Sequence, residues 1–245
     1  KGCETMNPIL DIQHLSVWYD KNNFVLEDIN LSLKQGYVYG LLGVNGAGKT
    51  TLLNTLTGIN RSFSGFFKMD DIKVEPDAKL HQWHESKKKR YFAADYPMLF
   101  TEMSAREYVK FVHKLYQKIY KEEEFLQLAE EFHFTKYVSR RISELSLGNR
   151  QKVVLITGLL LRVPLFILDE PLVGLDVESI EVFHQKMKKY CKNGGTILFS
   201  SHLLEIVKRF CDYAIILHNK KILSVVKINE NLDLHKEFFE VIRND

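Results

Sequence analysis

The sequence predicts an α/β fold built on a mainly parallel β-sheet that helices cover. Apolar runs at residues 37–42, 165–168 and 196–200 have the length and composition of buried strands. Segments with helical periodicity lie between them, as crossover connections between parallel strands require. The chain has 245 residues, of which 45% are hydrophobic and 27% charged, so it can bury a sizeable core.

The first third of the chain predicts an N-terminal antiparallel β portion followed by a strand, a glycine-rich turn and a helix. Residues 9–17 and 26–33 are typical of strands, and the second half of 26–33 alternates between apolar and polar residues. A helix is expected from Lys49 to Leu56, and Gly58 is a suitable stop. Residues 60–90 are mixed, with a short strand expected at 66–69.

The middle of the chain predicts a small helical insertion over roughly 100–145. A capping box at Ser104–Glu107 opens the first helix. Its apolar stripe is expected in the core and comprises Tyr108, Phe111, Val112, Leu115, Tyr116 and Ile119. A second helix is expected over 122–132. The basic run 87–90 is expected to be a solvated segment before a strand at 91–94, with a contact to anionic lipid or a partner as the alternative.

The last third returns to strands and helices in alternation. A helix is expected over 178–192, closed by Asn193-Gly194-Gly195. It connects the strands at 165–168 and 196–200. A hairpin over 213–226 turns near Asn219, and a short helix follows it.

Composition excludes several classes of protein. The net charge of +3 is too small to indicate nucleic-acid binding by itself. The cysteines, Cys3, Cys191 and Cys211, lack the spacing of a disulfide framework or a zinc site, so we expect reduced thiols. No secretory signal is evident. The longest apolar run, 153–161, is shorter than the roughly 20 residues that a membrane-spanning helix needs, so the chain can lie on a membrane but is not expected to cross one.

The glycine-rich turn carries the clearest chemistry. Its residues are Gly43, Val44, Asn45, Gly46, Ala47, Gly48, Lys49 and Thr50, followed by Thr51. They fit the phosphate-loop pattern, with a buried strand before it and a helix after it, which predicts a P-loop NTPase core. Backbone N–H groups and the helix N-terminus attract phosphate oxygens, Lys49 adds a positive charge, and the Thr50 hydroxyl can bind Mg²⁺. The cofactors predicted are therefore ATP and Mg²⁺.

Two carboxylates, Asp169 and Glu170, follow the strand at 165–168. Ligands of open α/β sheets bind at the carboxyl ends of the strands. Asp169 is the expected Mg²⁺ partner, and Glu170 is the expected general base that activates a water. A solvated Asp-Glu turn before Pro171 is the alternative, which the phosphate loop makes the weaker interpretation.

Three more segments reveal a family resemblance. Residues 145–152 precede a helix, 174–176 follow the acidic pair, and 200–202 end the next strand. With the phosphate loop and the acidic pair, they resemble the nucleotide-binding subunits of ATP-binding cassette (ABC) transporters, in the same order and over nearly the whole chain. The resemblance implies one ABC ATPase domain over 8–245, with the helical insertion inside it.

The resemblance also implies roles for individual residues. Ser146 and Gly148 would bind the outer phosphate of an ATP held by a second subunit, and Asp176 would lie in the loop that crosses the dimer interface. His202 resembles the histidine that contacts the outer phosphate, although an ordinary surface histidine is the alternative. Tyr19 resembles the aromatic residue that stacks on adenine, with Trp18 and Tyr39 as nearby aromatic alternatives.

The sequence departs from the family pattern at several positions. Asp95 stands where a glutamine that contacts Mg²⁺ and the membrane partner is usual. A carboxylate can still bind the metal, so Asp95 remains a candidate ligand. The other departures are Val44, Leu147, Asn149 and Val173, and none of them removes a group needed for catalysis.

The function implied is an ATP-hydrolysing transporter subunit, similar to bacterial exporter ATPases. It would pair head to tail with itself or with a homologous ATPase, and it would dock on an integral membrane permease from the cytoplasmic face of the cell membrane. The apolar cluster at 96–100 is the expected contact. The alternative is a soluble ABC-type ATPase that acts on the ribosome or DNA, but such proteins usually carry a long coiled coil or two cassettes. A catalytically dead ATP-binding protein is disfavoured because Lys49, Asp169, Glu170 and His202 are all present, and no nucleic-acid partner is expected.

Overall fold

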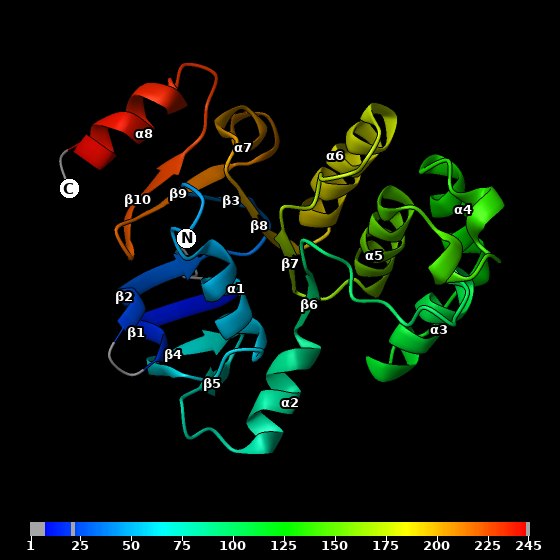
Figure 1. Ribbon diagram of the computed structural model, residues 1–245, viewed down its shortest axis with the longest axis horizontal. Helices are drawn as coiled ribbons and strands as arrows, with labels where there is room; N and C mark the ends of the chain where they lie inside the picture. The colour runs from blue at the N-terminus through cyan, green and yellow to red at the C-terminus, as the bar shows by residue number, and fades with distance from the viewer. Residues whose placement is uncertain (1–7, 21–22, 244–245) are drawn as a thin grey trace, which may run out of the picture.

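The computed structural model describes residues 8–20 and 23–243 and contains two β-sheets (Figure 1). One sheet has six strands, in the spatial order β10 (Lys221–Lys227), β9 (Tyr213–His218), β3 (Val38–Leu42), β8 (Thr196–Ser201), β7 (Leu165–Asp169) and β6 (Arg90–Ala93). All neighbours in it are parallel except β9 and β10, which form the expected hairpin. The prediction of an α/β fold with a mainly parallel sheet is confirmed.

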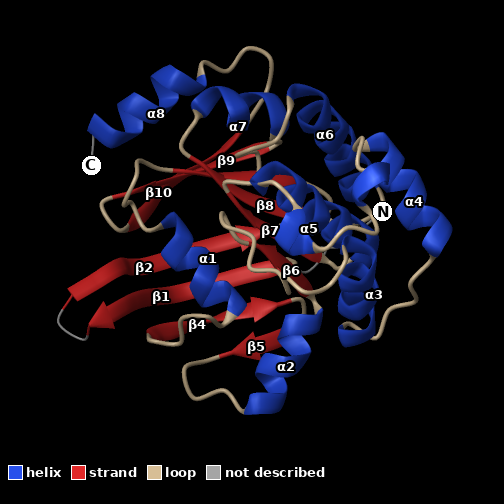
Figure 2. Ribbon diagram, turned by 45° about the vertical axis from the view of Figure 1, so that its right-hand side comes forward, coloured by secondary structure: helices blue, strands red, loops and turns tan. Residues whose placement is uncertain are grey.

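The second sheet is antiparallel and is formed by the N-terminal part of the chain. Its strands, in spatial order, are β2 (Asn23–Leu33), β1 (Leu10–Asp20), β4 (Phe63–Met69) and β5 (Ile72–Val74). Helix α1 (Lys49–Thr57) lies between this sheet and the six-stranded sheet (Figures 1 and 2). The expected N-terminal antiparallel portion is therefore present, and it supports the helix that follows the phosphate loop.

Side-chain alternation divides the six-stranded sheet into two faces. Leu41, Ile167 and Leu198 lie in the apolar cluster shared with α1 and the antiparallel sheet. Their neighbours Leu42 and Leu168 lie in the cluster on the opposite face. This period of two is the geometry of a strand, and because both faces are apolar the central strands are buried throughout.

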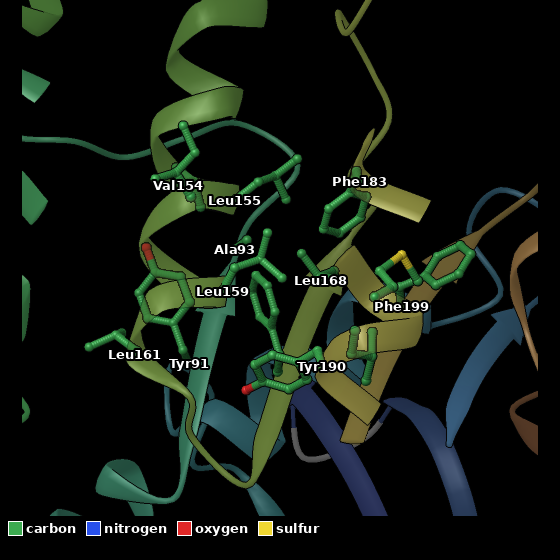
Figure 3. Close-up of a cluster of buried hydrophobic side chains, with 14 of the residues drawn as sticks. Tyr91, Ala93, Val154, Leu155, Leu159, Leu161, Leu168, Phe183, Tyr190 and Phe199 are labelled. Atoms are coloured by element: carbon green, nitrogen blue, oxygen red, sulfur yellow. The ribbon is translucent and has the colours of Figure 1, made fainter. Parts of the chain in front are cut away.

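Helices cover the face of the sheet that α1 leaves open. They are α3 (Ala105–Leu115), α4 (Glu122–Glu131), α5 (Leu147–Leu161), α6 (Val177–Lys192), α7 (Leu204–Phe210) and α8 (Leu234–Arg243). Figure 3 shows Val154, Leu155 and Leu159 of α5 beside Tyr91 and Ala93 of β6. Helix α5 is buried nearly all round from Gln151 onward, which explains the apolar run at 153–161. Helices α3 and α4 lie outside α5, at the right of Figure 1.

Two local predictions are wrong. Residues 60–90 contain strand β5 and a helix, α2 (Leu80–Lys88), that were not expected. The basic run is solvated only in part: Lys87 is exposed and Lys88 is partly exposed at the end of this helix, whereas Arg90 begins β6 with only 2% of its surface exposed. Helix α2 buries only Trp83 and Ser86, so its sequence carries almost no apolar periodicity.

The apolar stripe of the helical insertion is shorter than predicted. Helix α3 ends at Leu115, and Gln117 adopts a left-handed backbone conformation with φ of 55°. The chain therefore turns away, and Leu115 and Ile119 are exposed instead of lying in the core. Cys191 and Cys211 are buried free thiols, whereas Cys3 lies outside the described residues. No helix in the described part of the chain is long and apolar enough to cross a membrane.

Candidate nucleotide-binding site

The carboxyl ends of β3 and β7 open into one pocket of about 300 Å³. We call it the phosphate pocket; it is lined by Val25, residues 45–51, Asp95, Asp169 and Glu170. The loop residues and the two carboxylates are more than 100 residues apart in sequence, and the parallel pairing of β3, β8 and β7 brings them to the same edge of the sheet. This is the edge at which ligands of open α/β folds bind.

The glycines of the loop are required by its backbone. Gly46 and Gly48 have φ of 82° and 104°, which side-chain-bearing residues rarely adopt. Gly48 caps the N-terminus of α1, and this end of the helix, with the free N–H groups of its first turn, lies at the pocket. The Lys49 ammonium donates to the Gly43 carbonyl at 2.7 Å and to the Val44 carbonyl at 3.3 Å. Burial lowers the pKa of Lys49, and the nearby Glu170 and Asp169 oppose this effect.

Asp169 is the last residue of β7 and is only 1% exposed. Its Oδ1 accepts a short hydrogen bond from the Ser200 hydroxyl. Its Oδ2 is buried and has no hydrogen-bond partner in the structure. A buried carboxylate oxygen without a partner is costly unless a ligand supplies one. Because Asp169 lines the phosphate pocket, a cation bound there would satisfy it.

Glu170 leaves the strand in a left-handed conformation, with φ of 43°. Strained backbone of this kind costs on the order of 1–3 kcal/mol and is concentrated at functional sites. Glu170 Oε1 lies 2.9 Å from Nδ1 of His202, and both side chains are partly exposed. His202 is therefore joined to the pocket through Glu170.

Two other candidates lie at the margin of the pocket. Asp95 lines it, and its Oδ1 accepts from the Tyr96 backbone N–H at 2.7 Å. Tyr19 is 64% exposed, and its hydroxyl lies 3.2 Å from Oγ1 of Thr51 on α1. Tyr19 is thus held beside the loop with its ring accessible to a ligand.

Ser146, Gly148 and Asp176 form a separate group that does not line the phosphate pocket. Ser146 caps the N-terminus of α5, and Asp176 caps that of α6. A methyl group added at Gly148 would lie 2.1 Å from the Gly174 carbonyl oxygen, so the two segments touch through their backbones. We call residues 146–148 the signature segment.

The N-terminal half of α5 is also tied to the chain that follows the acidic pair. Gln151 donates to the Pro171 carbonyl at 3.1 Å, and the Lys152 ammonium lies 2.7 Å from Oδ2 of Asp176. Burial tends to raise the pKa of Asp176, but hydrogen bonds from Lys152 and Ser179 outweigh it and hold the pKa well below its usual range. Residues 171–176 and the signature segment therefore form one packed unit.

With this geometry in hand, comparison with known proteins decides the family. Residues 26–173, more than half of the chain, match the family described as ABC transporter. A protein of Bacillus subtilis (strain 168) named "Putative ABC transporter ATP-binding protein AlbC" is 66% identical over 237 residues, which cover 97% of this chain and 99% of that protein. The chain belongs to the ABC transporter family. Within it, this ABC protein is an ATP-binding subunit, and its reaction is ATP hydrolysis.

Other relatives and solved structures are similar to the ABC protein over most of their length. The SkfA peptide export ATP-binding protein SkfE of Bacillus subtilis (strain 168) is 30% identical and is covered over 97% of its length. The solved structure of an ATP-binding subunit of an ABC transporter superposes with a TM-score of 0.85, at 26% identity, over 96% of this chain and 99% of that one. A dimeric cassette, MJ0796, bound to ADP and Pi shares the fold with a TM-score of 0.79 at 22% identity, over 90% of this chain and 99% of that one.

Sequence reasoning missed four residues of this region: Val25, Gln151, Lys152 and Ser200. Val25 reaches the pocket from β2, and nothing in its local sequence distinguishes it from other strand residues. Gln151 and Lys152 lie within the segment quoted for the resemblance, but their partners are set by tertiary contact. Ser200 lies within the quoted segment 200–202, and its usable signal was its place near the end of the strand next to the one that Asp169 ends.

Proposed function

We propose that this ABC ATPase is the motor of a transporter whose membrane-spanning subunits are separate chains. The observation that carries the proposal is the phosphate pocket, which unites a buried ammonium, a helix N-terminus and a buried carboxylate oxygen without a partner. ATP would bind with its phosphates against residues 45–50. Tyr19 would stack on the adenine, because its ring is exposed beside the loop.

Mg²⁺ fits the residues that line the pocket. The ion is usually held by one or two protein oxygens together with substrate phosphates. Oδ2 of Asp169 and the hydroxyl of Thr50 are the protein oxygens that we assign to it, and Asp95 is a further candidate. The bound ion would supply positive charge that stabilises the phosphates during transfer.

Glu170 is the general base in this proposal. A water attacks the outer phosphorus, the bond from that phosphorus to the bridging oxygen of ADP breaks, and Glu170 accepts a proton of the water. His202 fixes Oε1 of Glu170 through the contact at 2.9 Å and so orients the carboxylate toward the pocket. Lys49 stabilises the negative charge that the outer phosphates carry.

The second half of each ATP site would come from another subunit. The signature segment opens a helix and does not line the phosphate pocket of its own chain, although it has the features of an anion site. We propose a head-to-tail pair in which each ATP contacts the phosphate pocket of one chain and Ser146 and Gly148 of the other. The MJ0796 cassette, which shares the fold, is named as dimeric, and this supports pairing of two chains but not a particular arrangement.

An exposed apolar patch is the proposed contact with the permease. Tyr96, Met98 and Phe100 are 60%, 89% and 56% exposed and follow directly after Asp95. Phe100 packs on Phe111 of α3, with ring centroids 5.3 Å apart, so the patch continues onto the helical insertion over 100–145 of the single ABC domain. Exposed apolar patches mark protein or membrane contacts. Docking there would place the motor on the inner face of the membrane, and we propose export because SkfE is named for peptide export.

Photo-crosslinking from the patch tests the docking proposal. A photoreactive residue replaces Met98, and the matched control replaces Leu80, which is 76% exposed on α2 outside the patch. We expect position 98, and not position 80, to crosslink to a polytopic membrane protein in native membranes. Crosslinks from position 98 to ribosomal or DNA-bound proteins would instead favour the soluble ABC-type ATPase.

A further inference from the structure

The Ser200 hydroxyl connects the two carboxylates of the site. It donates to Oδ1 of Asp169, and it accepts from the backbone N–H of Glu170 at 3.0 Å. Ser200 is fully buried. A serine hydroxyl has one hydrogen to donate and two lone pairs, so both contacts can form together.

The strand register explains how Ser200 reaches this position. Asp169 and Ser200 are direct partners in the parallel pairing of β7 with β8. Asp169 lies two residues after Ile167, and Ser200 lies two residues after Leu198. Ile167 and Leu198 both belong to the apolar cluster that includes the buried leucines of α1. Because side chains alternate along a strand, Asp169 and Ser200 point to the side on which the phosphate loop and α1 lie.

The two contacts have different consequences. The hydroxyl occupies one oxygen of Asp169 and fixes the carboxylate in the orientation that leaves Oδ2 buried and without a partner. The same hydroxyl anchors the Glu170 backbone, which is held at φ of 43°. Such a conformation persists only where the surrounding structure enforces it. One side chain thus sets the orientation of the proposed metal ligand and the direction in which the proposed base leaves the strand.

We infer that Ser200 is a positioning residue for ATP hydrolysis, acting through Asp169 and Glu170. The inference rests on the roles proposed above for these two carboxylates. Hydrogen-bond partners of metal ligands typically change metal affinity or activity by about 10–100-fold when they are removed. Ser200 would accordingly raise the affinity for the metal–nucleotide complex and the rate of hydrolysis, without contacting ATP.

The test compares binding of the non-hydrolysable analogue AMP-PNP with Mg²⁺ and with EDTA. For Ser200→Ala we expect the affinity in Mg²⁺ to fall by about 10–100-fold, with the affinity in EDTA unchanged, because the loop amides and Lys49 are untouched. Ser200→Cys, which preserves volume but donates weakly, should behave like Ser200→Ala. Ser200→Thr retains a hydroxyl and should restore most of the Mg²⁺-dependent affinity. A purely structural role would weaken binding equally in both conditions and would overturn the inference.

Two controls separate the possible failures. Thr196→Val removes a buried hydroxyl from the other end of the same strand, where it accepts from the Gly36 N–H at 3.1 Å, and it should bind like the wild type. Asp169→Asn is measured in parallel. If it retains the full Mg²⁺ effect, the proposed metal role of Asp169 is wrong. If Asp169→Asn loses that effect while Ser200→Ala keeps it, only the role of Ser200 is wrong. Should Ser200→Ala lose its cooperative melting transition, the contrast between the Cys and Thr variants decides.

Discussion

The phosphate pocket and the signature segment are both proposed to contact phosphate groups, but they differ in how many of their polar groups already have partners within the chain. In the pocket, the Lys49 ammonium donates to the Gly43 carbonyl of the loop, and Oδ2 of Asp169 has no hydrogen-bond partner among the described residues. In the signature region, Ser146 accepts from the Asn149 N–H, and Asp176 is held by Lys152 and Ser179. Under the proposed function, the pocket would bind the metal–nucleotide, whereas the signature region would be a preformed surface that contacts the nucleotide of another subunit.

The sharpest way to test the pocket is Glu170→Gln. Loss of a general base slows chemistry by roughly 10²–10⁴-fold, while the charge beside the phosphates becomes less negative, so ATP binding should persist. Phosphate release and ATP affinity are measured separately. Glu205→Gln is the matched control, because Glu205 also pairs with a histidine, His235 at 3.1 Å, but lies outside the phosphate pocket. Normal turnover in Glu170→Gln would remove Glu170 from the role of base.

Lys49→Ala tests whether the pocket binds nucleotide through its ammonium. Charge-assisted hydrogen bonds contribute about 1.5–3 kcal/mol each, so ATP affinity should fall by about 10–100-fold. Lys88→Ala removes a lysine paired with Glu85 on α2 and should leave the affinity unchanged. Equilibrium binding of a fluorescent ATP analogue gives both values. An unaltered affinity in Lys49→Ala would contradict the assigned role.

A mixing experiment tests whether the pocket and the signature segment serve different subunits. Lys49→Ala damages the pocket, and Ser146→Arg blocks the signature segment. Each variant alone should be nearly inactive, whereas an equal mixture should recover about one quarter of the wild-type ATPase rate, because half of the pairs are mixed and each mixed pair contains one intact composite site. Two wild-type preparations mixed in the same way give the reference rate. No recovery in the mixture would mean that both regions act within one chain.

The smallest expected effect concerns the Lys152–Asp176 pair and its dependence on pH. The pKa of Asp176 in the folded protein is lower than in the unfolded chain, so the pair stabilises the fold at neutral pH, and this contribution is lost as pH falls below about 4. We expect Lys152→Met to lower the free energy of unfolding by up to about 1 kcal/mol at pH 7, because Asp176 is half exposed to solvent. The difference should shrink at pH 3. Urea unfolding gives the free energies. An equal difference between the wild type and Lys152→Met at both pH values would argue against a stabilising ion pair between Lys152 and Asp176.

Motifs made of consecutive residues could be predicted from the sequence, whereas contacts between distant segments could not. The phosphate loop, the acidic pair and the strands that precede them are local patterns, and the structure places them at one pocket. Ser200 reaches Asp169 through the pairing of β8 with β7, and Val25 reaches the pocket from β2 of the other sheet; no local pattern specifies either contact. Helix α2 was missed because it buries only two side chains, and the α3 stripe was overextended because the periodicity does not show where the chain turns at Gln117.

The backbone contact between Gly148 and Gly174 has a mechanical consequence for a pair of these motors. Residues 171–174 follow Glu170 directly in the chain. They are held against α5 by the hydrogen bond from Gln151 to the Pro171 carbonyl and by the backbone contact between Gly148 and Gly174. In the head-to-tail pair proposed above, a shift of the chain behind Glu170 on ATP hydrolysis would move the signature segment, which would contact the ATP of the neighbouring subunit. The contact between Gly148 and Gly174 leaves no space for even a methyl group, so movement of one segment would be transmitted directly to the other. The two ATP sites of such a pair would then be mechanically coupled through the backbone alone.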